Sequence, residues 1–275
     1  MTGFALALFS TDPATVREAE AAGVEMIVVD WEFRGKTERQ AGADTEVNHD
    51  TPEDLRRVRA ATSATIVCRI NQLGPWTADE VDVAIDAGAD EILLPMVRSA
   101  ADVESLLRIV DGRCRSGILI ETGEAVDRAA DLASLPLSRV YFGLHDFAID
   151  RGTKSIFMPL VDGTLERTRA HFDVPFGFGG LTLPDRGSPI PARLLLGAMA
   201  ALDCGFSFLR RSFHRDVPRG SIAAGVAHIR EALSEAAGRS ADELERDRQE
   251  LEELVLAWPE RGHARAAGGA LAQEA

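Results

Sequence analysis

Charged side chains follow several short apolar runs of this sequence, at the positions where buried strands would end. They are Asp30, Glu32, Arg69, Glu121, Asp146, Arg210 and Arg211. Such side chains are almost never buried without a partner, so packing alone does not explain them. Four carboxylates near arginines indicate a bound cation and an anionic ligand, and oxygen ligands of this kind suit Mg²⁺ or Mn²⁺. The alternative is that these residues form salt bridges that hold loops at a rim.

The elements that must position these residues alternate along the chain. Runs rich in Val, Ile, Leu or Phe predict eight strands, at 4–10, 25–32, 65–71, 91–97, 117–122, 139–144, 175–181 and 206–213. Helices are predicted near 13–22, 52–61, 77–87, 100–110, 123–134, 160–171, 191–203 and 221–237. Several of the strands are apolar nearly throughout, which is typical of strands buried on both faces.

Helix start and stop signals support this alternation. Thr51 precedes Pro52 and two acidic residues, and Ser99 stands three residues before Asp102, as N-cap residues do. Gly23 and Gly88 each follow a predicted helix immediately before a strand.

Eight strand and helix pairs in about 235 residues predict a closed (β/α)₈ TIM barrel over residues 1–240, in the α/β class. The Gly-x-Gly-x-x-Gly pattern of a dinucleotide fold does not follow the first strand. Residues 241–257 predict one extra helix, with Leu244, Leu251, Leu254 and Val255 on one face. Residues 241–275 are therefore expected to be a C-terminal helix with a flexible tail, and the helix could cover the barrel bottom or reach a neighbouring subunit.

Composition excludes several functional classes. The chain has 275 residues and a net charge of −14, which disfavours non-specific binding to nucleic acids or anionic membranes. Neither a run of about 18 apolar residues nor a secretion signal is present. Three widely spaced cysteines form no disulfide or zinc pattern, so we expect a cytoplasmic protein.

Five segments in this order resemble the HpcH/HpaI family, the metal-dependent hydroxy-oxo-acid aldolases related to citrate lyase beta subunits. They are GVEMIVVDWE at 23–32, VCRIN at 67–71, AGADEILLPMV at 87–97, IET at 120–122 and FGLHD at 142–146. The resemblance covers about residues 4–235. It implies a TIM barrel in a homo-oligomer, a hexamer or trimer, that takes a 2-oxo acid and an aldehyde or acyl partner.

The resemblance also implies roles for individual residues. Glu121 and Asp146 match the ligands of Mg²⁺ or Mn²⁺, and Arg69 matches the arginine that grips the substrate carboxylate and enolate oxygen. Asp30 and Glu32 match acids that orient water at the metal. Asp86 matches an acid that some members lend to a neighbouring active site. Gly143, Leu144 and Arg211 are further predicted to bind substrate.

Two positions depart from the aldolase pattern. Phe33 stands where that branch has its histidine base, and Leu119 stands where it has a glutamine. Because phenylalanine cannot move a proton, another base is needed if the chemistry is kept. His145, next to Asp146, and His49, in the long polar loop 34–50, are the candidates. His145 could reach the substrate while Asp146 holds the metal only if the loop beyond the strand turns sharply, which the preceding Gly143 makes possible. Arg34, Lys36 and Arg39 could make that loop a cationic lid, or it could be a solvated charged loop.

The later glycine-rich segment from 179 to 191 predicts close backbone approach to a ligand. Strand alternation predicts that one of Arg210 and Arg211 faces the pore and the other faces the helices. The function we favour from the sequence is that of a metal-dependent carbon–carbon lyase or aldolase acting on a pyruvate-type enolate. A lyase for a CoA thioester or a phosphoenolpyruvate-type substrate, and a non-catalytic ligand-binding homologue, remain the alternatives.

Overall fold

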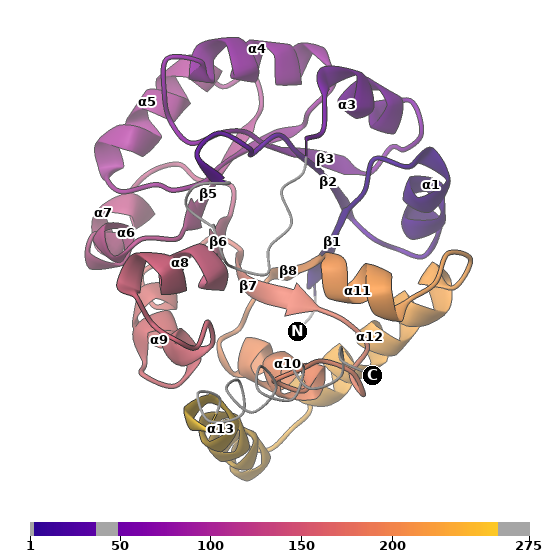
Figure 1. The fold of residues 1–275 in the computed structure, drawn as a ribbon, viewed down its shortest axis with the longest axis vertical. Helices are drawn as coiled ribbons and strands as arrows, with labels where there is room; N and C mark the ends of the chain where they lie inside the picture. The colour runs from indigo at the N-terminus through magenta and orange to yellow at the C-terminus, as the bar shows by residue number, and fades with distance from the viewer. Residues whose placement is uncertain (1–2, 37–48, 258–275) are drawn as a thin grey trace, which may run out of the picture.

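The computed structural model describes residues 3–36 and 49–257. Within these ranges, eight parallel strands close into a barrel in sequential order, and helices surround it (Figure 1). The TIM barrel expected from the sequence is therefore confirmed. The strands are β1 (Ala5–Phe9), β2 (Met26–Asp30), β3 (Thr65–Arg69), β4 (Glu91–Leu94), β5 (Arg115–Ile120), β6 (Val140–Phe142), β7 (Phe176–Leu181) and β8 (Phe206–Leu209).

Alternation along the strands divides the apolar side chains into two cores. One set points into the barrel, and it includes Phe9, Leu119, Tyr141 and Phe208. The larger set points outward and packs under the helices. Because both faces of each strand are covered, nearly every strand residue is buried, as the apolar runs predict.

The helices lie outside the strands and connect them. They are α1 (Pro13–Ala21), α3 (Pro52–Arg59), α4 (Thr77–Asp86), α5 (Ala100–Val110), α6 (Gly123–Asp127), α7 (Ala129–Ala133), α8 (Leu144–Arg151), α9 (Thr164–Arg169), α10 (Ala192–Ala201), α11 (Arg211–Asp216), α12 (Ile222–Ala237) and α13 (Ala241–Leu256), with a 3₁₀ turn, η1 (Met158–Leu160). Thr51 and Ser99 form the expected N-caps, both as capping boxes. Gly23 and Gly88 adopt the positive φ expected after a helix.

Several predicted boundaries differ from the structure, and the strand predicted to reach Val97, for example, ends at Leu94. The helix predicted at 123–134 is divided at Arg128 into α6 and α7. The strand predicted to reach Leu144 ends at Phe142, and the strand predicted to reach Phe213 ends at Leu209. In both cases the apolar pattern continues into a short helix, α8 or α11, whose Leu144 or Phe213 is buried in the outer core. The apolar pattern correctly predicted that these residues are buried, but it did not show that the backbone changes from strand to helix.

The extra C-terminal helix α13 packs against α10 of the same chain, on the outside of the barrel (Figure 1). Leu251 and Val255 are buried in this contact. Gly197 in α10 allows the close approach, because a Cβ there would lie 2.9 Å from Asp247 Oδ2. The helix therefore does not cover the barrel bottom. The predicted domain limit at residue 240 falls between α12 and α13, and the tail from 258 lies outside the described residues.

Among the described residues, none of the helices combines the length and apolar composition that a membrane span requires.

Shortening a buried side chain of α13 tests whether the packing of α13 on α10 stabilises the protein. Leu251→Ala should lower the free energy of unfolding by about 2–4 kcal/mol, because a buried leucine is removed and a cavity is left. Leu256→Ala, in the same helix but 57% exposed, should change it by less than about 0.5 kcal/mol. Urea denaturation of both variants measures the difference. Equal midpoints would show that α13 is not docked on α10.

Candidate active site at the carboxyl ends of the strands

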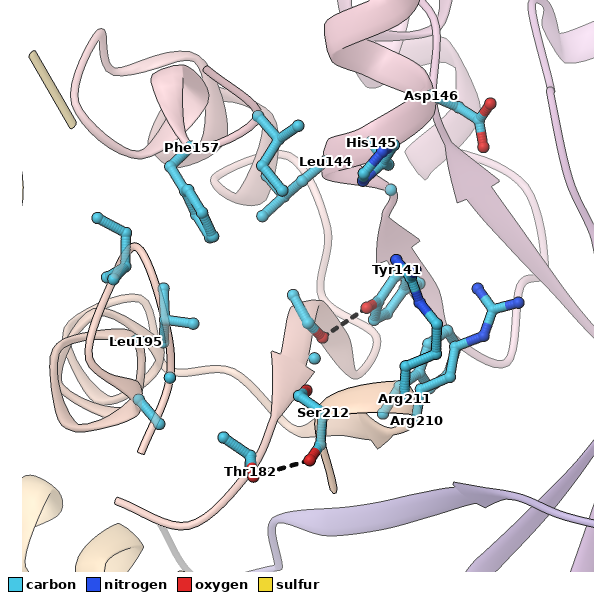
Figure 2. Close-up of a pocket in the computed structure, with 18 of the residues that line it drawn as sticks. Tyr141, Leu144, His145, Asp146, Phe157, Thr182, Leu195, Arg210, Arg211 and Ser212 are labelled. Atoms are coloured by element: carbon cyan, nitrogen blue, oxygen red, sulfur yellow. Dashed lines mark hydrogen bonds between the residues drawn. The ribbon is translucent and has the colours of Figure 1, made fainter. Parts of the chain in front are cut away.

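The main cavity opens at the carboxyl ends of the strands and has a volume of about 750 Å³. Its wall has two chemically different sides (Figure 2). Asp146, His145, Arg210 and Arg211 lie on one side, and Leu144, Phe157 and Leu195 lie on the other. A ligand in this cavity can therefore place a charged end and an apolar end against different walls.

Glu121 follows β5 directly and is 3% exposed. Its Oε2 accepts a hydrogen bond of 3.0 Å from the backbone N–H of Met96, a non-glycine residue held at φ +56°. Gly143 lies against the same carboxylate, because a Cβ at Gly143 would be 2.4 Å from Glu121 Oε1. The backbone after β4 and the backbone after β6 are thus both shaped around this one carboxylate.

Gly143 also corrects a sequence-based expectation. A sharp turn that used the conformational freedom of glycine was expected between the strand and Asp146. The φ of Gly143 is −86°, which any residue can adopt. The position instead excludes a side chain because Glu121 occupies that space. Gly143 and Leu144 both line the cavity, as expected of substrate-binding residues, although their role is not tested by the structure.

His145 and Asp146 stand in the first turn of α8, where the sequence predicted a loop. Asp146 is 5% exposed and His145 is half-buried, and both line the cavity. Successive residues of a helix diverge by about 100°, so His145 and Asp146 can face different parts of the same cavity without a sharp turn.

Glu121 and Asp146 are mutually unfavourable as neighbouring carboxylates. Burial and then the charge of Asp146 raise the pKa of Glu121 to about 8. A divalent cation would relieve this repulsion, and two carboxylates completed by water suit the oxygen coordination of Mg²⁺. The described residues hold no group of three or more His, Cys, Asp or Glu side chains that could bind a metal ion. The pair fits a hydrated hard cation, and the structure itself contains no metal.

Asp30 and Arg69 form a buried ion pair inside the barrel, and the charge of Arg69 acts to lower the pKa of Glu121. They are register partners of β2 and β3, so their side chains enter the pore together. Arg69 Nε donates to Asp30 Oδ1 at 2.8 Å and Arg69 Nη2 donates to Asp30 Oδ2 at 2.7 Å. Burial alone would raise the pKa of Asp30, but Arg69, Lys36 and Arg210 together hold it well below its usual range.

This pair changes what Arg69 can offer a ligand. The sequence predicted that its planar fork grips a substrate carboxylate, but Asp30 takes the edge formed by Nε and Nη2. Nη1 lies 3.2 Å from Glu32 Oε2. A substrate would therefore meet the remaining N–H groups of Nη1 and Nη2.

Two more cations complete this cluster. Lys36 Nζ lies 3.1 Å from Glu32 Oε2 and 3.7 Å from Asp30 Oδ2. Arg210 Nη2 donates to Asp30 Oδ2 at 3.2 Å, and its guanidinium lies over the Phe9 ring. The structure thus places Asp30 and Glu32 against cations, and Glu32 is also near enough to Glu121 for its charge to raise the pKa of Glu121.

Arg210 and Arg211 do not divide between pore and helices as alternation predicts, because β8 ends one residue earlier, at Leu209. Both line the cavity. Arg210 is half-buried in the Asp30 cluster, whereas Arg211 is exposed at the start of α11. Arg211 was named from the sequence as substrate-binding, and Arg210 joins it in the cavity wall.

The remaining predicted residues lie outside the cavity. His49 packs against Phe33, with ring centroids 5.7 Å apart, and is exposed. Asp86 is exposed at the carboxyl end of α4, which returns to the opposite end of the barrel. A contribution of Asp86 to a neighbouring subunit stays a prediction. Arg39 and most of the expected lid lie outside the described residues.

Sequence reasoning did not single out several cavity residues, among them Tyr141, Phe157 and Leu195, and it misplaced Lys36. Tyr141 in β6 donates a hydrogen bond of 2.5 Å to Gly179 O and forms part of the wall in Figure 2. Its place inside an apolar run concealed it. Lys36 was assigned to the lid because it follows a polar turn, yet it is 1% exposed.

The fold and this site define a TIM-barrel protein with an acidic pair and an arginine cluster at the carboxyl end of the barrel. A family model described as HpcH/HpaI aldolase/citrate lyase matches residues 4–156, which is more than half of the chain. The chain therefore belongs to this family, as its sequence motifs indicated. The family description supports a lyase-type enzyme, and the family is commonly dependent on divalent metals.

Individual relatives are more distant. A (3S)-malyl-CoA thioesterase of Cereibacter sphaeroides is 29% identical over 117 residues, which cover 39% of this chain and 41% of that protein. The chain thus matches about two fifths of the length of this relative. RipC from Yersinia pestis is 16% identical with a TM-score of 0.55, covering 88% of this chain and 98% of its own. The citrate synthase SbnG is 17% identical with a TM-score of 0.54, covering 85% and 93%. These two structures show the fold alone.

The raised pKa of Glu121 predicts a pH effect on stability. Without metal, folded Glu121 holds its proton up to about pH 8, whereas the unfolded chain releases it near 4.5. Because the folded state then binds more protons, stability should fall as pH rises between these values. Glu121→Gln, which resembles the protonated form, should flatten this decline. Urea midpoints in EDTA at several pH values measure it, and an equally steep decline in Glu121→Gln would exclude Glu121 as the source.

Proposed function

We propose that the protein is a divalent-metal-dependent carbon–carbon lyase that releases or uses the enolate of a pyruvate-type 2-oxo acid. The observation that carries this proposal is the buried pair Glu121 and Asp146 in the same cavity as Arg69. A chelating, anionic substrate requires an acid pair and a cationic cluster in the same cavity. The metal, when bound, would polarise the 2-oxo acid so that charge can develop on its enolate oxygen.

Each side chain has a distinct part in this reaction. Glu121 and Asp146 would hold Mg²⁺ or Mn²⁺. Arg69, fixed by Asp30, would present its remaining N–H groups to the carboxylate and to the enolate oxygen, where charge develops. The apolar wall with Leu144, Phe157 and Leu195 would receive the aldehyde or acyl partner. The aldol hydroxyl proton would pass to His145, which lines the cavity beside Asp146.

A second candidate is the cleavage of a CoA thioester. It is supported by the partial match to a malyl-CoA thioesterase and by the exposed Arg211 and Arg215 at the cavity wall. Arginines at the mouth of a TIM barrel suit phosphate groups such as those of CoA.

Two assays distinguish the candidates. The Mg²⁺-loaded protein is incubated with a panel of 4-hydroxy-2-oxo acids, and pyruvate is measured; in parallel it is incubated with malyl-CoA, and the free thiol is measured. Pyruvate release without thiol release supports the aldolase proposal. Thiol release alone supports the second candidate, and turnover of neither would leave a ligand-binding homologue.

Removing the charge of Glu121 tests the metal site. Changes outside the ligand shell typically cost 10–100-fold in metal affinity, so Glu121→Gln should weaken Mg²⁺ or Mn²⁺ binding by at least about 100-fold. Glu124→Gln is the matched control, because Glu124 is exposed at the start of α6 and pairs with Arg98. Calorimetric titration measures both variants. Parent-like affinity in Glu121→Gln would remove Glu121 from the metal site.

Replacing His145 tests the proton acceptor in bond cleavage. His145→Asn should lower turnover of the aldol substrate by about 10²–10⁴-fold and leave metal affinity nearly unchanged. His228→Asn, on the exposed side of α12, is the control. If His145→Asn cleaves the substrate at the parent rate, the hydroxyl proton does not go to His145, and a matched His49→Asn measurement follows.

A further inference from the structure

Lysine is rare in this chain, and one of its two lysines is buried in the site. Of the 30 cationic residues counted as lysine or arginine, Lys36 and Lys154 alone are lysines. Both lysines line the cavity, but Lys154 is exposed, whereas Lys36 is 1% exposed. Arginine keeps its proton at any physiological pH, but lysine can give one up and take it back. A buried lysine among arginines therefore has a property that its neighbours lack.

The turn that carries Lys36 is held in place from β3. Asn71 Oδ1 accepts hydrogen bonds from the backbone N–H groups of Phe33 at 3.0 Å and of Arg34 at 2.8 Å. The amide of Asn71 in turn donates to Glu80 Oε1 at 2.7 Å. Lys36 N then donates to Phe33 O at 3.2 Å. This arrangement folds the chain back and directs the Lys36 side chain into the barrel.

Lys36 lies next to the position that a substrate held by Arg69 would take. Its Nζ and Arg69 Nη1 contact the same oxygen, Glu32 Oε2, at 3.1 and 3.2 Å. Although Glu32 is close, Lys36 Nζ makes no hydrogen bond of acceptable geometry within the described part of the chain. Its N–H groups can therefore point toward a ligand in the cavity. Burial and then the charge of Arg69 lower the pKa of Lys36, which makes its ammonium a better acid.

We propose that Lys36 is a second catalytic residue, which protonates the methylene carbon of the enolate at the Arg69 end of the cavity. This inference rests on the proposed function. The electron pair of the enolate forms the new C–H bond, the N–H bond of Lys36 breaks, and the carbonyl of the 2-oxo acid is restored. Lys36 is left as an amine and regains a proton from solvent. In reverse, the amine removes a proton from the methyl group.

Two proton transfers in the proposed reaction would then use different side chains. His145 belongs to α8, beside Asp146, and would receive the hydroxyl proton when the C–C bond breaks. Lys36 belongs to the Asp30 and Arg69 side, and would act on the enolate that remains. Exchange of the pyruvate methyl protons with deuterated solvent involves the second transfer alone, because no C–C bond is made or broken.

The exchange is measured by ¹H NMR with Mg²⁺ present. Oxalate affinity is measured by calorimetry and gives a readout that does not depend on activity. Lys36→Arg keeps the positive charge but cannot serve as an acid, because arginine stays protonated at physiological pH. Lys36→Met removes both the charge and the acid. Lys36→Arg should bind oxalate within about threefold of the parent and lose at least about 100-fold in exchange rate. Lys36→Met should lose exchange and also weaken oxalate binding. His228→Asn, on the exposed side of α12, is the control and should match the parent in both measurements.

Each result is decisive. Exchange by Lys36→Arg within about threefold of the parent would show that Lys36 only balances charge. Reduction with borohydride that attaches pyruvate to Lys36 would also overturn the proposal, because the amine would then be a nucleophile. Should Lys36→Arg not fold, exchange by Lys36→Met at the parent rate overturns it equally. If the parent does not exchange the methyl protons of pyruvate, the proposed function fails, and the role of Lys36 fails with it. Exchange by the parent and not by Lys36→Arg supports both.

Discussion

The two-bond pair between Asp30 and Arg69 is the interaction on which one half of the site depends. A guanidinium can be buried inside a barrel only if its charge is compensated, and the register of β2 and β3 supplies Asp30 directly opposite. Glu32 adds a second carboxylate, and these two acids account for the positions of Lys36 and Arg210. Removing one partner from such a cluster leaves an unpaired buried charge, which typically costs about 3–5 kcal/mol. Because apolar residues would pack this space at lower cost, the cluster is better explained by binding than by stability.

The buried charges around the cavity form two groups. Cations gather with Asp30 and Glu32 at the ends of β2, β3 and β8, whereas Glu121 and Asp146 stand together after β5 and β6. Four buried carboxylates, Asp30, Glu32, Glu121 and Asp146, face three buried or half-buried cations, Lys36, Arg69 and Arg210. A dication at the acidic side makes the total positive by one, and a substrate carboxylate then neutralises it. This charge pattern favours the binding of a metal together with a monoanion over the binding of either alone.

The sequence predicted the barrel and the strand-end residues because eight apolar runs and their caps are local signals. Arg69, Glu121 and Asp146 were found for that reason, since polar residues after apolar runs mark one edge of a parallel barrel. Local signals failed where apolarity crosses from strand to helix, as at Leu144. They also failed for Lys36, because its burial depends on the hydrogen bonds that the preceding turn donates to Asn71, 35 positions further along the chain. Gly143 was noticed for its flexibility, but its role depends on Glu121, which only the folded barrel brings against it.

Two buried glutamates, Glu91 and Glu121, differ in how well their charges are compensated, and this difference distinguishes a structural carboxylate from a ligand-binding one. Glu91, at the start of β4, is fully buried but accepts hydrogen bonds from Arg139 Nε at 2.7 Å, Arg139 Nη2 at 2.8 Å and Ser138 Oγ at 2.6 Å. Its charge is fully compensated, at the end of the barrel away from the cavity. Glu121 accepts one hydrogen bond among the described residues, and its neighbour is another carboxylate. Its position also requires a left-handed Met96 and a missing side chain at Gly143. A chain that only needed to be stable would compensate Glu121 as it does Glu91, so the strain and the repulsion around Glu121 indicate a ligand-binding carboxylate.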